Sequence, residues 1–198
     1  MLGKQSKILT KHQIEMVSSY LRSKRNGLRN QTIFLLSVKG GLRSKEISEI
    51  RWCEVMNSDG EIDNVISLTN KTSKGKSGRL IPLHKEIRSN LEEILKEQID
   101  QKGFDPSKDT IIKTERSDST SSQSIVNMFQ RWYKRLGLLG CSSHSGRRTF
   151  ITETSKKISL VGGSLKDIQM MVGHRSLQTT QRYIEGDSES QRKVVDLI

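Results

Sequence analysis

The stretch VGHRSLQTTQRYI, at residues 172–184, places His174 nine residues before Tyr183. A tyrosine hydroxyl is a weak nucleophile at neutral pH because its ordinary pKa is about 10. A tyrosine that performs chemistry therefore needs cationic side chains that stabilise negative charge at the reacting centre. The spacing of apolar residues predicts a helix over 165–172 that ends at Gly173, and a last helix that begins after Ser176 and carries Tyr183.

Two cationic residues lie just upstream, in HSGRRTF at residues 144–150. We expect a helix to start near His144, so that His144 and Arg147, three residues apart, share one face. A helix N-terminus presents unpaired N–H groups and a partial positive charge, which makes phosphate the natural target of such a pair. A His-x-x-Arg pattern also arises by chance, and the alternative is a helix cap beside a surface arginine.

A third cation, Arg43, lies in GGLRSKEISEIRW at residues 40–52. Ser44 is expected to cap a short helix with Arg43 at its mouth, and the two preceding glycines allow the backbone to come close to another group. Glu46 follows three residues later and could fix the aim of the guanidinium. An ordinary exposed ion pair between Arg43 and Glu46 is the alternative.

A lysine-bearing hairpin is predicted between these motifs. Residues 62–69 and 79–83 have the composition of strands, and the intervening turn NKTSKGKSG is polar and rich in glycine. The sequence around Gly75 is not a Walker loop, because Asn70 stands where that pattern requires a glycine. A lysine on this hairpin can instead donate a proton to a leaving group.

The remaining patterns predict an α+β fold that is mainly α-helical, with a small antiparallel sheet of about three strands. Thr10 and Gln13 form a capping box for the first helix, and a second, more apolar helix ends at Gly40-Gly41. Further elements are a helix over 85–102, a short strand over 110–113, a Ser-rich loop over 117–124 and a helix over 122–136. The apolar positions of that last helix, including Trp132, favour a core stripe over a base-stacking platform.

The charge of the chain favours a polyanionic partner. Lys and Arg number 34 against 22 Asp and Glu, a net charge of +12, and the excess gathers in residues 1–30, 71–85 and 131–148. Solvated helix faces explain any one cluster, but three together favour a nucleic-acid surface. No apolar run approaches the roughly 18 residues of a membrane span and no signal peptide is recognisable, so we expect a cytoplasmic protein with Cys53 and Cys141 as buried thiols.

In this order and spacing, the four motifs GLRSKEISEIRW, SKGKSGRLIPL, HSGRRTF and VGHRSLQTTQRY resemble the catalytic domain of the tyrosine recombinase (phage integrase) family over nearly the whole chain. The resemblance implies that Tyr183 attacks a DNA phosphorus and becomes joined to the 3′ phosphate. It implies that Arg43, Arg147 and His174 bind the phosphate oxygens and that His144 helps to take the tyrosine proton. Lys74 would protonate the leaving oxygen; it is chosen over Lys71 and Lys76 because it lies eight residues before Pro82.

The same resemblance implies a partner and an assembly. The partner is double-stranded DNA at specific recombination sites, and the protein self-associates into a tetramer there, in the cytoplasm of a bacterium or of the host of a phage or mobile element. No metal and no nucleotide cofactor is required. The expected DNA-contacting residues are basic: Lys71, Lys76, Arg79, Arg148 and Arg175. The rival interpretation is a metal site formed by His144, His174, Cys53 and Cys141, where only Cys141-x-x-His144 has a suitable spacing.

The chain also departs from the family pattern. Gly146 stands where a leucine is common and Arg148 where a histidine or lysine is common. We expect an N-terminal arm at 1–9, the catalytic domain at 10–185 and a tail at 186–198 that docks on a neighbouring protomer. We expect the separate N-terminal core-binding domain of the family to be absent, which would fit either a short member of the family or a catalytic fragment. Two alternative functions stay open: type IB topoisomerase-like DNA relaxation, and a non-catalytic DNA-binding regulator.

Overall fold

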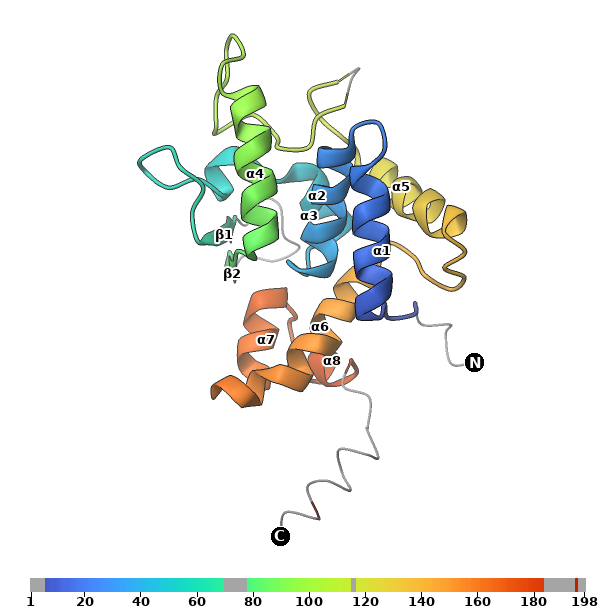
Figure 1. Ribbon diagram of the computed structural model, residues 1–198. Coiled ribbons are helices and arrows are strands. Elements are labelled where there is room, and N and C mark those ends of the chain that lie inside the picture. Colours follow the sequence, from blue (N-terminus) through green and yellow to red (C-terminus); the bar gives the residue numbers. More distant parts are fainter. Residues whose placement is uncertain (1–5, 70–77, 115–116, 184–194, 196–198) are drawn as a thin grey trace.

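The computed structural model describes residues 6–69, 78–114, 117–183 and 195. Figure 1 shows a larger group of helices, α1 to α5, above a smaller group, α6 to α8. The elements in chain order are α1 (Lys11–Arg22), α2 (Gly27–Val38), α3 (Ser44–Glu49), the 3-10 helix η1 (Trp52–Glu54), β1 (Val65–Leu68), β2 (Arg79–Pro82), α4 (Lys85–Gln98), α5 (Ser122–Arg135), α6 (Ser145–Lys157), the 3-10 helix η2 (Ile158–Val161), α7 (Leu165–Val172) and α8 (Leu177–Gln181).

Helix α2 is the centre of the larger group. It packs against both α1 and α4 (Figure 1), and every residue from Thr32 to Val38 is buried. A helix that is apolar on all sides is stable only where other elements surround it. The capping box predicted for α1 is confirmed. The backbone N–H of Gln13 donates to Thr10 Oγ1, and the backbone N–H of Thr10 donates to Gln13 Oε1.

The sheet is an antiparallel pair of β1 and β2, with Ile66 opposite Ile81. The third strand predicted over 110–113 does not form in the part of the chain that the structure describes, where Thr110 makes an isolated bridge to Arg51. Ile111 and Ile112 are both buried, whereas a strand on a small surface sheet alternates buried and exposed positions. These two isoleucines fill the main core.

Some element boundaries differ from the prediction, although α5 begins at Ser122 as predicted. α4 ends at Gln98 instead of 102. The N-cap of α3 is Arg43, not Ser44. The Glu46 carboxylate, rather than a serine hydroxyl, accepts the hydrogen bond from the backbone N–H of Arg43. α8 ends at Gln181, so Tyr183 lies in the turn just beyond the helix.

The core stripe predicted for α5 is confirmed: Ile125 and Phe129 are buried, and Trp132 and Leu136 are partly buried and pack against the same core. Tyr133, which the sequence did not single out, is also buried there. The prediction of two buried thiols is corrected. Cys53 is exposed and Cys141 half-buried, so neither is the fully buried thiol that the sequence suggested. Among the described residues, no helix is both long enough and apolar enough to cross a membrane.

The smaller group has a core of its own. Ile151, Ile168 and Val172 are buried together, and Tyr183 is among the half-buried residues packed on them. α6 connects the two groups because Gly146 near its start faces Ser37 on α2, while Ile151 packs with the buried residues of α7. Gly146 permits this approach, since a Cβ there would lie 2.4 Å from Ser37 Oγ.

Candidate active site

A cleft of about 420 Å³ opens where the two groups of helices meet. Its walls come from the loop before α3, the start of α6 and the segment from α7 through the end of α8. We call it the basic cleft; it is lined by Ser6, Arg43, His144, Arg147, Arg148, His174, Thr179, Arg182 and Tyr183. The structure therefore brings together every predicted catalytic residue except Lys74, which lies outside the described residues.

Arg147 joins the two groups of helices at the bottom of this cleft. Its guanidinium donates to the Gly41 carbonyl oxygen at 2.5 Å and to the Val172 carbonyl oxygen at 2.6 Å. Burial, together with repulsion from nearby Arg43, lowers the pKa of Arg147 to about 9, so the side chain keeps its charge at neutral pH. A buried cation held by neutral carbonyls retains its attraction for an anion that enters the cleft.

The Gly41 carbonyl is available to Arg147 because residue 41 is a glycine. Its φ is +67°, a conformation that residues with a side chain rarely adopt. A Cβ at this position would also lie 2.5 Å from Cδ1 of Phe150 on α6. The glycine pair that was predicted to end α2 therefore also allows α6 to approach the site.

Arg43 is aimed by a buried carboxylate. Glu46 Oε1 accepts from Arg43 Nη1 at 2.9 Å, and Glu46 Oε2 accepts from the Arg43 backbone amide at 2.7 Å. The interaction is not the ordinary exposed ion pair considered as the alternative, because Glu46 is only 1% exposed. Burial opposes ionisation of this carboxyl, but the hydrogen bonds and positive charges of Arg79 and Arg43 outweigh it and hold the pKa of Glu46 below its ordinary value.

Arg79 is placed differently from the surface DNA contact that the sequence suggested. It is 9% exposed; Nη2 donates to Glu46 Oε2 at 2.8 Å and Nε donates to the Met171 carbonyl oxygen at 2.9 Å. Arg79 therefore connects β2 and α3 to the end of α7. The period of two along β2 could have revealed this, since Arg79 lies on the same face as buried Ile81 while Leu80 is 63% exposed.

His174 and Tyr183 lie next to each other in the basic cleft. Their rings are stacked, with centroids 5.5 Å apart and planes inclined by 21°. Thr152 on α6 donates its hydroxyl proton to the Tyr183 carbonyl oxygen at 3.2 Å, which holds the backbone of the turn. Burial and the positive charges of Arg147, Arg43 and Arg79 lower the pKa of His174 to about 4, so its ring is neutral at neutral pH.

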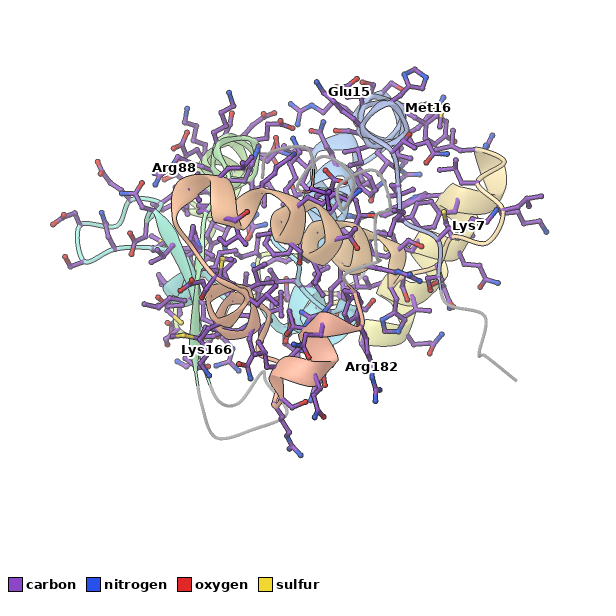
Figure 2. All side chains as sticks on the ribbon, turned by 90° about the horizontal axis from the view of Figure 1, so that it is seen from below. Lys7, Glu15, Met16, Arg88, Lys166 and Arg182 are labelled. Atoms are coloured by element: carbon purple, nitrogen blue, oxygen red, sulfur yellow. The ribbon has the colours of Figure 1, made fainter. Side chains whose placement is uncertain are left out.

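The other predicted residues are spread around the cleft. His144 is the N-cap residue of α6, as predicted, and its side chain is exposed. Arg148 lines the cleft and donates to the Ser6 carbonyl oxygen at 3.0 Å, and Arg175 is exposed. Arg182, which the sequence did not single out, also lines the cleft and is labelled at the end of α8 in Figure 2. Lys71 and Lys76, like Lys74, lie outside the described residues.

The four residues of the alternative metal site do not lie together. His144 and His174 line the cleft, whereas Cys53 and Cys141 do not. Within residues 6–69, 78–114 and 117–183, no group of three or more His, Cys, Asp or Glu side chains is arranged to hold a metal ion.

The sequence matches the phage integrase family over residues 7–190, which include every element that builds the cleft. The chain belongs to the phage integrase family. Tyrosine recombinase XerA of Thermococcus kodakarensis is 25% identical to it over 187 residues, covering 94% of this chain and 61% of XerA. Tyrosine recombinase XerC of Chlamydia pneumoniae is 29% identical over 164 residues, covering 82% of this chain and 49% of XerC.

Solved structures of integrases and recombinases have the same fold. A crystal structure of XerA recombinase superposes with a TM-score of 0.75 at 19% identity, over 96% of this chain and 64% of that one. The Tn1549 transposon integrase in complex with a circular intermediate DNA also gives a TM-score of 0.75, at 18% identity, over 98% of this chain and 66% of that one. The chain thus spans about half to two thirds of the length of these relatives and solved structures.

Proposed function

We propose that residues 10–185 form the catalytic domain of a site-specific DNA recombinase that cleaves and rejoins strands through a covalent 3′-phosphotyrosyl intermediate. The observation that carries this proposal is the basic cleft, which gathers Arg43, Arg147 and neutral His174 around the ring of Tyr183. The recombinase names of XerA and XerC support it. So does the DNA complex of the Tn1549 transposon integrase.

We assign a role to each group, to Lys74 from its place in the sequence and to the others from their place in the basic cleft. Tyr183 Oη attacks the scissile phosphorus and bonds to it, the bond from phosphorus to the 5′ oxygen breaks, and the phosphate stays bonded to the 3′ oxygen of the cleaved strand. His144 receives the tyrosine proton and Lys74 protonates the departing 5′ oxygen. Arg43 and Arg147 stabilise the charge that grows on the non-bridging oxygens, since guanidinium groups match that geometry and stay protonated.

The second half of the reaction reverses the first with a different strand. A 5′ hydroxyl from a partner DNA attacks the phosphotyrosyl phosphorus, and Tyr183 leaves with its proton restored. The phosphotyrosyl bond conserves the energy of the phosphodiester, so neither ATP nor another energy source is consumed. Because one phosphodiester is broken for each one formed, strands can be exchanged between two duplexes without an energy source.

A covalent-adduct assay tests the proposal. Nicked duplexes made from the DNA that neighbours the gene are labelled at either end of the cleaved strand and incubated with the protein. If the link is 3′-phosphotyrosyl, the protein stays bonded to the strand segment on the 5′ side of the break. The label at the 5′ end then migrates with the protein in a denaturing gel, and the label at the 3′ end does not. We expect Tyr183→Phe to form no adduct, and an equal amount from this variant would contradict the assignment.

The same substrates separate the alternative functions. Relaxation of supercoiled plasmid without exchange between two duplexes would indicate a topoisomerase-like enzyme. Tight binding with no adduct from the wild-type protein would indicate a DNA-binding regulator. Strand exchange between two duplexes is the outcome that supports a recombinase.

We further propose that the protein acts on double-stranded DNA in the cytoplasm and self-associates there, as a tetramer, through residues 186–198. The tail ends in four apolar residues, Val194, Val195, Leu197 and Ile198, and Val195 is 67% exposed. Apolar surface of this kind is stabilised by burial against a partner. Deletion of residues 190–198 should weaken assembly on DNA in sedimentation experiments and spare single-strand cleavage, whereas unchanged strand exchange would contradict this role.

A further inference from the structure

The neutral ring of His174 has two nitrogens in different environments. Nδ1 lies 3.0 Å from Oγ1 of Thr180, whose side chain is 0% exposed. Nε2 has no hydrogen-bond partner among the described residues. It is not fully buried either, so a ligand can reach it. Since His174 lines the basic cleft, the nitrogen opposite Thr180 is the one available to a ligand there.

The two tautomers of this ring have opposite effects on a phosphate. A neutral imidazole has one N–H donor and one lone-pair acceptor. A non-bridging phosphate oxygen only accepts, so an Nε2–H attracts it and an Nε2 lone pair repels it. Burial and the nearby arginines keep the ring from becoming doubly protonated at neutral pH, so the tautomer alone decides the sign of this interaction.

The hydroxyl of Thr180 determines which tautomer is present. Its proton needs an acceptor because the side chain is buried, and Nδ1 of His174 is its hydrogen-bond partner in the part of the chain that the structure describes. The Thr180 carbonyl oxygen already accepts from the Tyr183 amide at 3.0 Å. With the hydroxyl donating to Nδ1, the ring proton is placed on Nε2.

We propose that Thr180 is a positioning residue that donates its hydroxyl proton to Nδ1 of His174 and so presents Nε2–H to the scissile phosphate. The proposal rests on the proposed recombinase function for its catalytic consequence. The tautomer itself is a property of the protein without DNA. The same contact orients the ring against which Tyr183 stacks.

Two substitutions and a matched control test the role. Thr180→Val replaces the hydroxyl by a methyl group of similar size, and Thr180→Ser keeps the hydroxyl. Thr32→Val is the control, because Thr32 is equally buried and its hydroxyl donates to the Leu28 carbonyl oxygen within α2, away from the cleft. Loss of a buried hydroxyl is common to both valine variants, but only Thr180→Val removes the partner of His174.

The first readout is the nitrogen spectrum of His174 in ¹⁵N-histidine-labelled protein at neutral pH, without DNA. We expect wild type and Thr180→Ser to show a protonated Nε2 and an unprotonated Nδ1. Thr180→Val should shift the signals toward a mixture of tautomers, and Thr32→Val should leave them unchanged. A protonated Nδ1 in the wild type, or an unchanged spectrum in Thr180→Val, would overturn the proposal.

The second readout is the rate of adduct formation with a cleavable duplex. Thr180→Val should slow it by about 10- to 100-fold, the range typical of residues that orient a functional histidine, while DNA affinity is retained. Thr180→Ser should restore most of the rate, and an unchanged rate in Thr180→Val would overturn the catalytic consequence. If the wild type forms no adduct, the proposed function is wrong, and the spectra still decide the tautomer.

Discussion

The imidazole of His174 stays neutral beside three arginines, and this has consequences that a titration can measure. Its ordinary pKa of 6.5 falls to about 4 because of burial first and then the charges of Arg147, Arg43 and Arg79. A group whose pKa is lower in the folded state contributes stability above its unfolded pKa. That stability is lost as the pH falls from about 6.5 through 4.

We therefore predict that Arg43→Ala raises the pKa of His174 toward 6.5, because it removes one of these positive charges. An NMR titration of the His174 ring measures the midpoint directly. Lys24→Ala, a change of the same charge at a residue outside the cleft, is the control and should leave the midpoint in place. A midpoint that stays near 4 in Arg43→Ala would show that the charge of Arg43 does not contribute to the lowered pKa of His174.

Arg79 provides a second test at the residue scale, because its buried position contradicts a role as a surface DNA contact. Arg79→Ala leaves the Glu46 carboxylate buried with one partner fewer, which should lower the free energy of unfolding by about 3–5 kcal/mol. Urea denaturation measures this change. Arg79→Lys should recover only part of it, since an ammonium cannot contact Glu46 and the Met171 carbonyl in the same fork geometry.

DNA binding distinguishes the two possible roles of Arg79. A lysine or arginine that contacts phosphate contributes about one unit to the dependence of log affinity on log salt concentration. We expect exposed Arg175→Ala to reduce this slope by about one and Arg79→Met, which removes the positive charge but keeps an unbranched side chain, to leave it unchanged. A reduced slope in folded Arg79→Met would return Arg79 to the DNA-contacting surface.

At the scale of elements, the contact between α2 and α6 determines where the basic cleft is placed. Gly146 on α6 faces Ser37 on α2, and Ser37 Oγ is buried with no hydrogen-bond partner among the described residues. The absence of a side chain at residue 146 brings the start of α6, with His144 and Arg147, close to Gly41. A larger residue, such as the leucine common in the family, cannot occupy this position without moving α6.

We predict that Gly146→Ala lowers the free energy of unfolding by about 1–3 kcal/mol, the usual cost of overpacking a close contact. Ser37→Ala alone should be neutral or slightly stabilising, because it removes a buried hydroxyl that has no partner. The double variant should recover part of the loss, since the atom at 2.4 Å is gone. Thermal unfolding of the four proteins completes the cycle, and strictly additive effects would contradict the contact.

At the scale of the whole molecule, the described residues form two hydrophobic cores of unequal size, and the basic cleft opens where the two groups of helices meet. The larger one extends from α1 to α5, and the smaller one comprises three fully buried residues of α6 and α7 with their half-buried neighbours. Arg147 crosses the junction, since it donates to Gly41 on one side and to Val172 on the other. A small core linked in this way depends on the junction for its stability.

We predict that Arg147→Lys loosens the smaller group selectively, because a lysine cannot donate to both carbonyls in the same geometry. Amide hydrogen exchange should become faster in α7 and α8 while α2 keeps its protection. Lys157→Ala, at an exposed position of α6, is the control. An equal loss of protection in α2 would show that the two groups unfold as one unit.

The sequence by itself determined the helices, the β1–β2 pair and the residue types of the site. Apolar spacing and capping residues act within a few positions, so α1, α5, α7 and the start of α6 could be predicted locally. The order of Arg43, His144, Arg147, His174 and Tyr183 led to the prediction that these residues meet at one site, and the basic cleft brings them together. The prediction of a third strand was wrong, because the burial of Ile111 and Ile112 depends on distant parts of the chain.

Only the tertiary structure decided how these groups act on one another. Thr180 approaches Nδ1 of His174, Arg79 turns inward to Glu46, and Arg147 reaches two carbonyls that lie far apart in sequence. Each of these contacts depends on distance and burial in three dimensions, which determine pKa, tautomer and charge pairing. Residue types can be read from a linear chain, but the electrostatic state of His174 beside Tyr183 exists only once the two groups of helices have packed together.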